Sequence, residues 1–391
     1  MKSATGFRRA ERLNQLPPYL FVEMDRAKNE LRAEGADVID LGIGDPDLPT
    51  FPEIVEALRE AAGDPTTHRY PCQRGDMDLR REIARWFHEH YGVELDPARE
   101  VLVLIGTKEG LGHLPTAVLN PGRSALVPDP GYPVYQAASW LAGGEVAHVR
   151  LEPELGFRPD LERLSKRALE DAELMFLNYP NNPTGASADP ELFQLALNLA
   201  REHNFVVVND AAYAEIVFDG PRLSLMQSGA ARDVAIELHS FSKTYNMTGW
   251  RVGFAVGSAD VLDALAQVKD NIDSCVFTAI QRAAQAALRL PDERVRGQLE
   301  IYRRRRDVLV DGLWEAGWQV PRPHATFYVW ARVPEGEGDS SSFARKVLRE
   351  THVVITPGVG FGPSGEGYVR MALTAPEDRV AEAVDRLTRI L

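Results

Sequence analysis

The sequence contains very little cysteine: Cys72 and Cys275 are its only two in 391 residues, and they lie far apart. They provide neither a disulfide framework nor the repeated spacing of a zinc site, so we expect no metal and a reducing, cytoplasmic setting. No apolar run approaches the ~20 residues that span a bilayer, and the N-terminal segment lacks the apolar core of a signal peptide. Membrane insertion and export are therefore disfavoured.

Positively charged residues are outnumbered by negatively charged ones, with 44 Lys and Arg against 57 Asp and Glu. The formal net charge of −13 would repel nucleic acid and anionic membranes. One arginine run, residues 303–306, lies within a helical pattern, and we expect it to form a solvated helix face. Hydrophobic content of 44% and charged content of 26% are ordinary for a globular protein, and a chain of 391 residues is long enough for two lobes.

Short apolar runs alternate with helix-like stretches over the middle of the chain. This alternation predicts an α/β fold with a mainly parallel sheet covered by helices. Later runs interleaved with helices predict a smaller α+β domain. We expect an N-terminal arm with part of the small domain at 1–50, a large domain at 51–285 and a small C-terminal domain at 286–391. The apolar runs begin at Val101, Ser124, Leu174, Phe205, Thr326, His352 and Tyr368.

One lysine, Lys243, lies in the polar, glycine-containing segment SFSKTYNMTGWRVGF between two apolar strands. A lysine there can form an imine with an aldehyde, but an exposed lysine with a pKa of ~10.4 is a poor nucleophile. Arg251 could lower that pKa by repulsion, and Ser240, Ser242 and Arg251 together suit a phosphate. Taken alone, a solvated loop lysine is the commoner explanation.

Polar residues also follow the other predicted strands, where open α/β sheets bind ligands. Gly106, Thr107 and Lys108 lie at a strand end and helix start, which is an anion site or an ordinary turn. Asp210 follows the apolar run FVVVN, with Tyr213 just beyond it. A carboxylate there either caps a helix or binds a buried cation.

Four further residues have both a chemical and a plain structural explanation. Asn182, in a turn between prolines, can donate to a phenolic oxygen. Tyr132 can stack on a flat ring or simply pack in its loop. Tyr70 can reach a phosphate or lie on the surface. Arg370, within an apolar strand, requires a carboxylate partner, which is a bound ligand or a structural ion pair.

Together, the segments SFSKTYNMTGWRVGF, NYPNNPTG, DAAY and PGYPVY and the late arginine resemble the motifs of the class I/II, fold-type I pyridoxal-phosphate aminotransferases. The resemblance covers practically the whole chain, including LPPYLF and GIGDPDLP. It implies a fold-type I transferase with pyridoxal 5′-phosphate as cofactor. It also implies small amino acid and 2-oxo acid substrates, and a homodimer with shared active sites.

The resemblance implies a role for each matching residue. Lys243 would bind the cofactor as an imine and then act as general acid and base. Asp210 would pair with the pyridinium nitrogen, and Asn182 and Tyr213 would hydrogen-bond the phenolic oxygen. Tyr132 would stack on the ring. The phosphate would be surrounded by Gly106, Thr107, Lys108, Ser240, Ser242 and Arg251, with Tyr70 reaching it from the second subunit. The substrate would contact Tyr19, Gly44, Lys108, Tyr132, Asn182 and Arg370.

Within the family, the combination of LPPYLF, LGIGDPDLPT, GTKEG and FLNYPNNPT is most similar to the branch that acts on LL-diaminopimelate. That branch interconverts tetrahydrodipicolinate plus glutamate with LL-diaminopimelate plus 2-oxoglutarate, on the route to lysine. An aspartate- or alanine-type aminotransferase and a carbon–sulfur β-lyase with the same cofactor remain alternatives. A non-catalytic regulator is least favoured, because it would require a DNA-binding module and the chain is strongly negative.

Overall fold

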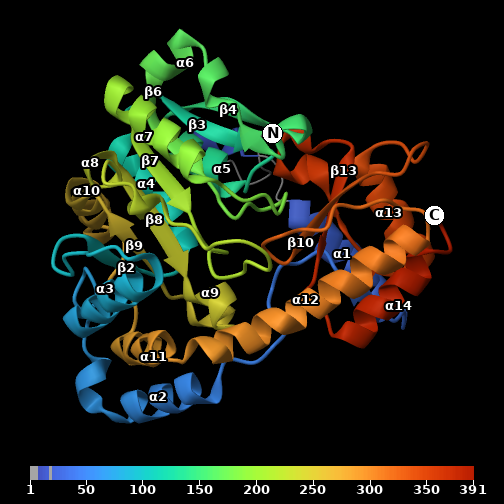
Figure 1. Cartoon of the computed structure of the whole chain (residues 1–391), viewed down its shortest axis with the longest axis horizontal. Coiled ribbons are helices and arrows are strands. Elements are labelled where there is room, and N and C mark those ends of the chain that lie inside the picture. The colour runs from blue at the N-terminus through green and yellow to red at the C-terminus, as the bar shows by residue number, and fades with distance from the viewer. Residues whose placement is uncertain (1–7, 17–19) are drawn as a thin grey trace.

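The computed structural model describes residues 8–16 and 20–391, which form two lobes joined by the long helix α12 (Asp292–Glu315) (Figure 1). Within these residues, no helix is long and apolar enough to cross a membrane. Three helices follow one another from residue 259 to residue 315: α10 (Ala259–Asp270), α11 (Thr278–Leu288) and α12, with Pro291 directly before α12.

The larger lobe is built on an eight-stranded sheet with the order β2-β9-β8-β7-β6-β3-β4-β5. Neighbours from β8 through β4 are parallel, whereas β9 runs antiparallel to both β2 and β8, and β5 antiparallel to β4. The predicted mainly parallel sheet is therefore confirmed. Its strands are β2 (Val101–Leu104), β3 (Ser124–Asp129), β4 (Glu145–Glu152), β5 (Arg158–Pro159), β6 (Ala172–Leu177), β7 (Val206–Asp210), β8 (Ala235–Ser240) and β9 (Gly253–Gly257).

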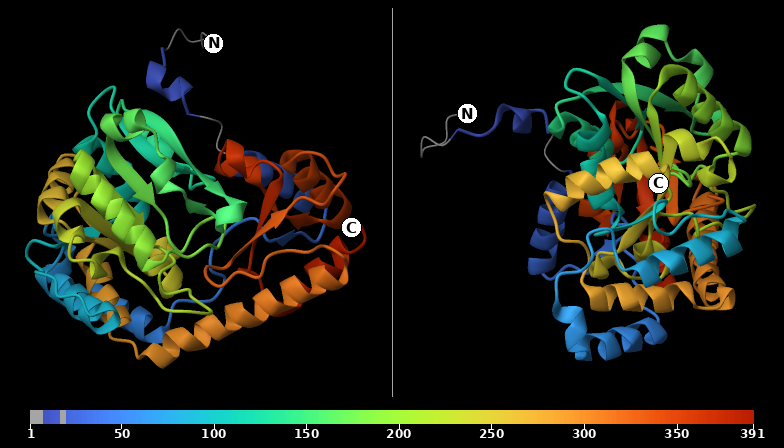
Figure 2. Two further views of the ribbon diagram at one scale, coloured as in Figure 1. Left: turned by 45° about the horizontal axis from the view of Figure 1, so that its top comes forward. Right: turned by 90° about the vertical axis from the view of Figure 1, so that its left-hand side faces the viewer.

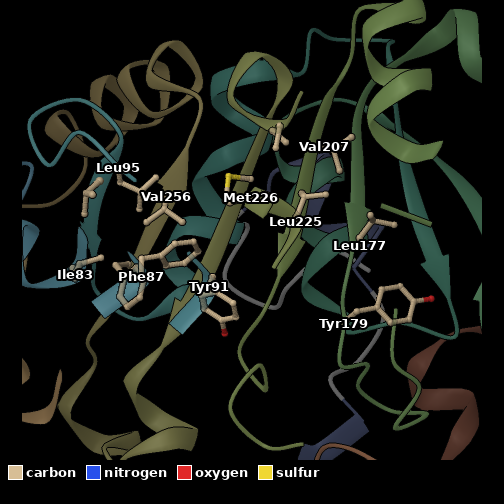
Figure 3. Packing of buried hydrophobic residues seen from close by; sticks show 14 of the residues in the cluster. Ile83, Phe87, Tyr91, Leu95, Leu177, Tyr179, Val207, Leu225, Met226 and Val256 are labelled. Carbon is tan, nitrogen blue, oxygen red and sulfur yellow. The ribbon is translucent and has the colours of Figure 1, made fainter. Parts of the chain in front are cut away.

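Helices cover both faces of this sheet, because alternate strand residues point to opposite sides. On β7, Val207 packs in one core with α3 and α7, and Val208 packs in another with α4, α5 and α10. Figure 3 shows the first core, where Phe87 and Tyr91 of α3 lie near Val256 of β9. The helices of this lobe are α2 (Pro52–Gly63), α3 (Met77–Tyr91), α4 (Thr107–Val118), α5 (Val134–Leu141), α6 (Lys166–Asp171), α7 (Pro190–His203), α8 (Ala231–Val234), α9 (Phe241–Thr244), α10 and α11.

The smaller lobe combines C-terminal elements with a strand from near the N-terminus. The short strand β1 pairs in parallel with β11, and a second sheet has the order β10-β13-β12. The left view of Figure 2 shows α12 running along the molecule into this lobe. The elements besides α12 are α1 (Leu20–Ala33), β1 (Ile39–Asp40), β10 (Tyr328–Arg332), α13 (Ser340–Thr351), β11 (Val353–Val354), β12 (Thr356–Pro357), β13 (Tyr368–Ala372) and α14 (Glu377–Leu387).

The expectation of a solvated arginine face on α12 was wrong for two of its four residues. Arg305 and Arg306 are only 3% and 5% exposed. Arg305 donates to both carboxylate oxygens of Asp47 at 2.7 and 2.8 Å, and Arg306 donates to Asp219 at 3.0 Å. The helix lies against other elements along one side, and the partners are distant in sequence, so local charge patterning did not reveal this burial.

Candidate active site

A cavity of about 400 Å³ lies at the carboxyl ends of the parallel strands, with residues of both lobes in its wall. It contains most of the site residues predicted from the sequence, which come from strand ends, helix starts and loops. They are Gly44, Thr107, Lys108, Tyr132, Asn182, Asp210, Tyr213, Ser240, Ser242, Lys243, Arg251 and Arg370.

Lys243 lies in the short helix α9 rather than in an open loop, and its Nζ donates to the carbonyl oxygen of Gly44 at 2.7 Å. Burial lowers the pKa of Lys243 from 10.5 to about 8. This shift includes smaller effects of nearby charges, since Asp45 raises the pKa and Arg370 and Arg251 lower it. Desolvation, not the repulsion by Arg251 that the sequence suggested, is thus the largest cause.

This depressed pKa predicts how the amine of Lys243 titrates in the cofactor-free protein. Because the pKa is lowered to about 8, the proton is lost as the pH rises through 8, and the neutral, nucleophilic amine predominates above it. Labelling by acetic anhydride, followed by peptide mass spectrometry, should show half-maximal reactivity of Lys243 near pH 8. A short lysine peptide, with a pKa of ~10.4, is the control. Parallel profiles for the two would contradict the prediction.

Asp210 ends strand β7 and is only 5% exposed. Burial raises its pKa to about 6, while a hydrogen bond from the Tyr135 hydroxyl at 2.9 Å and one from the Ala212 amide at 3.3 Å favour the carboxylate. A cation placed against this carboxylate would compensate its desolvation. The geometry therefore favours the cation-binding alternative for Asp210 over helix capping.

Asn182 and Asp210 are connected through Asn178. The side-chain oxygen of Asn178 accepts from the backbone N–H of Asn182 at 2.8 Å, and its side-chain nitrogen donates to the backbone carbonyl of Asp210 at 2.6 Å. The side-chain oxygen of Asn182 accepts from Arg370 at 2.7 Å, so the side chain offers its N–H groups to a ligand in the cavity. This polarity matches the role of donor to a phenolic oxygen.

Arg370 lies on strand β13 and is 3% exposed. Besides Asn182, it donates to the carbonyl oxygen of Gly42 at 2.7 Å. Its guanidinium carbon lies 4.1 Å from the ring centroid of Tyr328 and 4.7 Å from that of Phe361. Neutral acceptors and aromatic faces thus fix this cation at the cavity wall, where it suits a carboxylate ligand.

The other end of the cavity suits an anion. Gly106 precedes helix α4 with a φ of +73°, and a Cβ there would collide with Nη2 of Arg251. Arg251 is oriented by donating to the Thr248 carbonyl at 2.8 Å. The start of α4, the Arg251 guanidinium and the hydroxyls of Thr107, Ser240 and Ser242 lie around the same cavity, and such groups suit a phosphate.

Comparisons with known proteins agree with this geometry. The sequence matches the family described as aminotransferase class I and II over residues 36–387. The chain belongs to this family. It is similar to the LL-diaminopimelate aminotransferases of Syntrophobacter fumaroxidans, with 52% identity over 98% of this chain and 99% of the relative, and Desulforudis audaxviator, with 50% identity over 98% and 97%.

Solved structures show the same fold. The substrate-bound structure of BacF from Bacillus subtilis has a TM-score of 0.96 and 39% identity, covering 98% of each chain. A probable N-succinyldiaminopimelate aminotransferase from Thermus thermophilus has a TM-score of 0.90 and 38% identity, covering 95% of this chain and 100% of that one. The fold-type I assignment is therefore confirmed.

The donor set of this aminotransferase fits pyridoxal 5′-phosphate, the cofactor that the family implies. The cavity provides an amine in Lys243, a buried carboxylate in Asp210 and a phosphate site around Arg251. Tyr132 also lies in the wall, where its ring could cover a flat ligand. A larger residue in place of Gly106 would be strained at its φ of +73° and would displace the Arg251 guanidinium from the phosphate end of the cavity.

Three predicted residues are not placed in the lining of this cavity. Gly106 lies directly before α4, against the Arg251 guanidinium, and does not line the cavity itself. Tyr70 is 89% exposed and is not among the lining residues of its own subunit, so a role in a second subunit stays a prediction. Tyr19 lies outside the described residues.

Sequence reasoning missed several residues of the site, among them Tyr135, Asn178, Tyr328 and Phe361. The first two occur within the motifs PGYPVY and NYPNNPTG, three residues after Tyr132 and four residues before Asn182. Their place in the same motifs is the signal that could have found them. Tyr328 and Phe361 belong to the smaller lobe and carried no comparable local signal.

Proposed function

We propose that this aminotransferase binds pyridoxal 5′-phosphate and interconverts LL-diaminopimelate plus 2-oxoglutarate with tetrahydrodipicolinate plus glutamate, in lysine biosynthesis. One observation carries the reaction type: a single cavity unites the amine of Lys243, the carboxylate of Asp210 and the guanidinium of Arg370. The substrate rests on relatives of about half identical sequence that bear this activity in their names.

Bound pyridoxal 5′-phosphate supplies an electron sink for the electrons of the substrate Cα–H bond. The Asp210 carboxylate, which the hydrogen bond from Tyr135 orients, would hold the pyridinium nitrogen and keep it charged. Tyr213 and Asn182 would donate to the phenolic oxygen of the ring. Lys243, whose pKa burial lowers from 10.5 toward neutrality, would take the proton from the substrate Cα as a neutral amine and return it afterwards.

Arg370 binds the substrate α-carboxylate through its guanidinium, which is fixed beforehand by Asn182, Gly42 and two aromatic rings. This preorganisation saves the entropy of ordering a long side chain on binding. We expect Lys108, an exposed residue of the cavity lining, to contact the more distal part of the substrate or the phosphate.

We further propose a cytoplasmic homodimer in which Tyr70 reaches the phosphate site of the second copy. The exposure of this large side chain, 89%, supports a contact outside its own subunit.

The substrate proposal is tested by a panel of amino donors with 2-oxoglutarate as acceptor. LL-diaminopimelate should give kcat/KM at least about tenfold above meso-diaminopimelate, aspartate and alanine, since contacts to a distal polar group separate such substrates by about 1.4 kcal/mol or more. Glutamate formation is measured by a coupled dehydrogenase assay. Activity confined to aspartate or alanine would replace the proposed substrate, and pyruvate with ammonia from cystathionine would indicate the β-lyase instead.

A further inference from the structure

One side chain of the smaller lobe, Tyr328 at the start of β10, contacts three separate parts of the proposed site. It is 2% exposed and lines the cavity. Its hydroxyl lies 2.9 Å from the hydroxyl of Tyr213, and its ring lies 4.1 Å from the guanidinium carbon of Arg370. Its hydroxyl also packs against Gly44, where an added Cβ would collide with the Tyr328 oxygen.

The hydrogen bond between the two tyrosines determines which proton faces the ligand. Each hydroxyl has one proton. When Tyr213 donates its one proton to a phenolic oxygen in the cavity, its hydroxyl can only act as the acceptor toward Tyr328. Tyr328 is then the donor in their 2.9 Å hydrogen bond. Donation into an oxygen strengthens that group as a donor in turn, because linked hydrogen bonds polarise one another.

The ring of Tyr328 acts on a different group. Together with Phe361, whose ring centroid is 4.7 Å from the Arg370 guanidinium carbon, it provides an aromatic surround for the cation. An aromatic face attracts a guanidinium electrostatically and restricts its rotation. The contact with Gly44 matters as well, because the carbonyl of Gly44 accepts from Lys243 at 2.7 Å.

We propose that Tyr328 is a positioning residue with two separable functions. Its hydroxyl donates to Tyr213 and thereby strengthens the hydrogen bond from Tyr213 to the phenolic oxygen of the cofactor, and its ring orients Arg370 for the substrate carboxylate. The inference rests on the proposed function, since it requires a cofactor with a phenolic oxygen and a carboxylate substrate. Tyr328 touches the groups that act rather than the reacting atoms.

Two substitutions separate the functions. Tyr328→Phe removes the hydroxyl and keeps the ring, whereas Tyr328→Leu removes both. In the cofactor-loaded enzyme, weaker donation to the phenolic oxygen leaves more negative charge there, which stabilises the protonated nitrogen nearby. The pH midpoint of the visible absorbance should therefore rise in both variants, by roughly half a pH unit, as expected for weakening one hydrogen bond in a chain.

The ring function has its own readout. The dissociation constant of succinate, a carboxylate probe, should change less than about twofold in Tyr328→Phe and increase about five- to tenfold in Tyr328→Leu, the range of a partly desolvated cation–π contact. KM for glutamate should follow the same order. Tyr302→Phe is the matched control, because it removes a hydroxyl from the same core at a residue that does not line the cavity.

An unchanged absorbance midpoint in Tyr328→Phe would overturn the hydroxyl function, and unchanged succinate affinity in Tyr328→Leu would overturn the ring function. Failure of the proposed function is distinguishable, because then the unmodified enzyme itself would show no pH-dependent absorbance and no transamination. Should Tyr328→Leu not fold, Tyr328→Met supplies a less drastic removal of the ring for the same measurement.

Discussion

Lys243→Ala is expected to lower kcat for transamination by about 10⁴-fold or more. The substitution removes the amine that transfers the proton, which has a lowered pKa and lies in the cavity with Gly44 and Arg370. A general acid or base alone raises a reaction rate by up to about 10⁴-fold. Steady-state kinetics with glutamate as donor measures the loss. Lys243→Arg should be similarly inactive, because an arginine stays protonated at any physiological pH.

The fold should survive this substitution. Burial of a charged ammonium is unfavourable below the pKa of about 8, so removing it should not lower the thermal midpoint of the cofactor-free protein at pH 7. A second check is to reduce the loaded enzyme with borohydride and identify the modified peptide by mass spectrometry. Attachment at a lysine other than Lys243, or activity within tenfold of the unmodified enzyme, would contradict the assignment.

Asp210→Asn is expected to lower kcat by about 10²- to 10³-fold. Asparagine preserves the shape and the contact from Tyr135 but removes the charge that pairs with the pyridinium, and breaking a buried charge pair costs about 3–5 kcal/mol. Tyr135→Phe is the matched control, since it removes one hydrogen bond and keeps the carboxylate, and it should reduce kcat by less than about tenfold. A kcat for Asp210→Asn within fivefold of the unmodified enzyme would exclude the pairing role.

Asp210→Asn should raise the stability of the cofactor-free protein at neutral pH, although it lowers kcat. Because the pKa of Asp210 is raised from 3.8 to about 6, the protonated acid favours the folded state below pH 4, and this contribution is lost as the pH rises through 6. Asp210→Asn stays neutral throughout. Its thermal midpoint should therefore exceed that of the unmodified protein at pH 7.5 and match it near pH 4, as calorimetry can measure.

Much of the site could be predicted because its residues occur in short motifs at strand ends. Lys243, Asp210 and Asn182 follow apolar runs that become neighbouring parallel strands, so the sheet brings their side chains to one edge. Each motif taken alone also had a plain structural explanation. The resemblance to the aminotransferase family favoured the chemical explanation, because one cofactor accounts for all the motifs together. The family and the fold type are confirmed by the comparisons.

What could not be predicted depends on contacts between distant segments. Tyr328 meets Tyr213 across 115 positions of sequence, and Arg305 meets Asp47 across 258. No sequence pattern near these residues indicates their contacts. The residues of each pair come together only when β1, β10, β13 and α12 assemble as one lobe.

The sequence by itself determined the α/β architecture, the family and the chemical type of each principal group, because strand periodicity and motif residues are local properties of the chain. Only the tertiary structure decided the pKa values of Lys243 and Asp210, the orientation of Arg370 and the partner of Tyr213. These properties come from desolvation and from groups supplied by other segments, and both exist only after the two lobes have packed around the cavity.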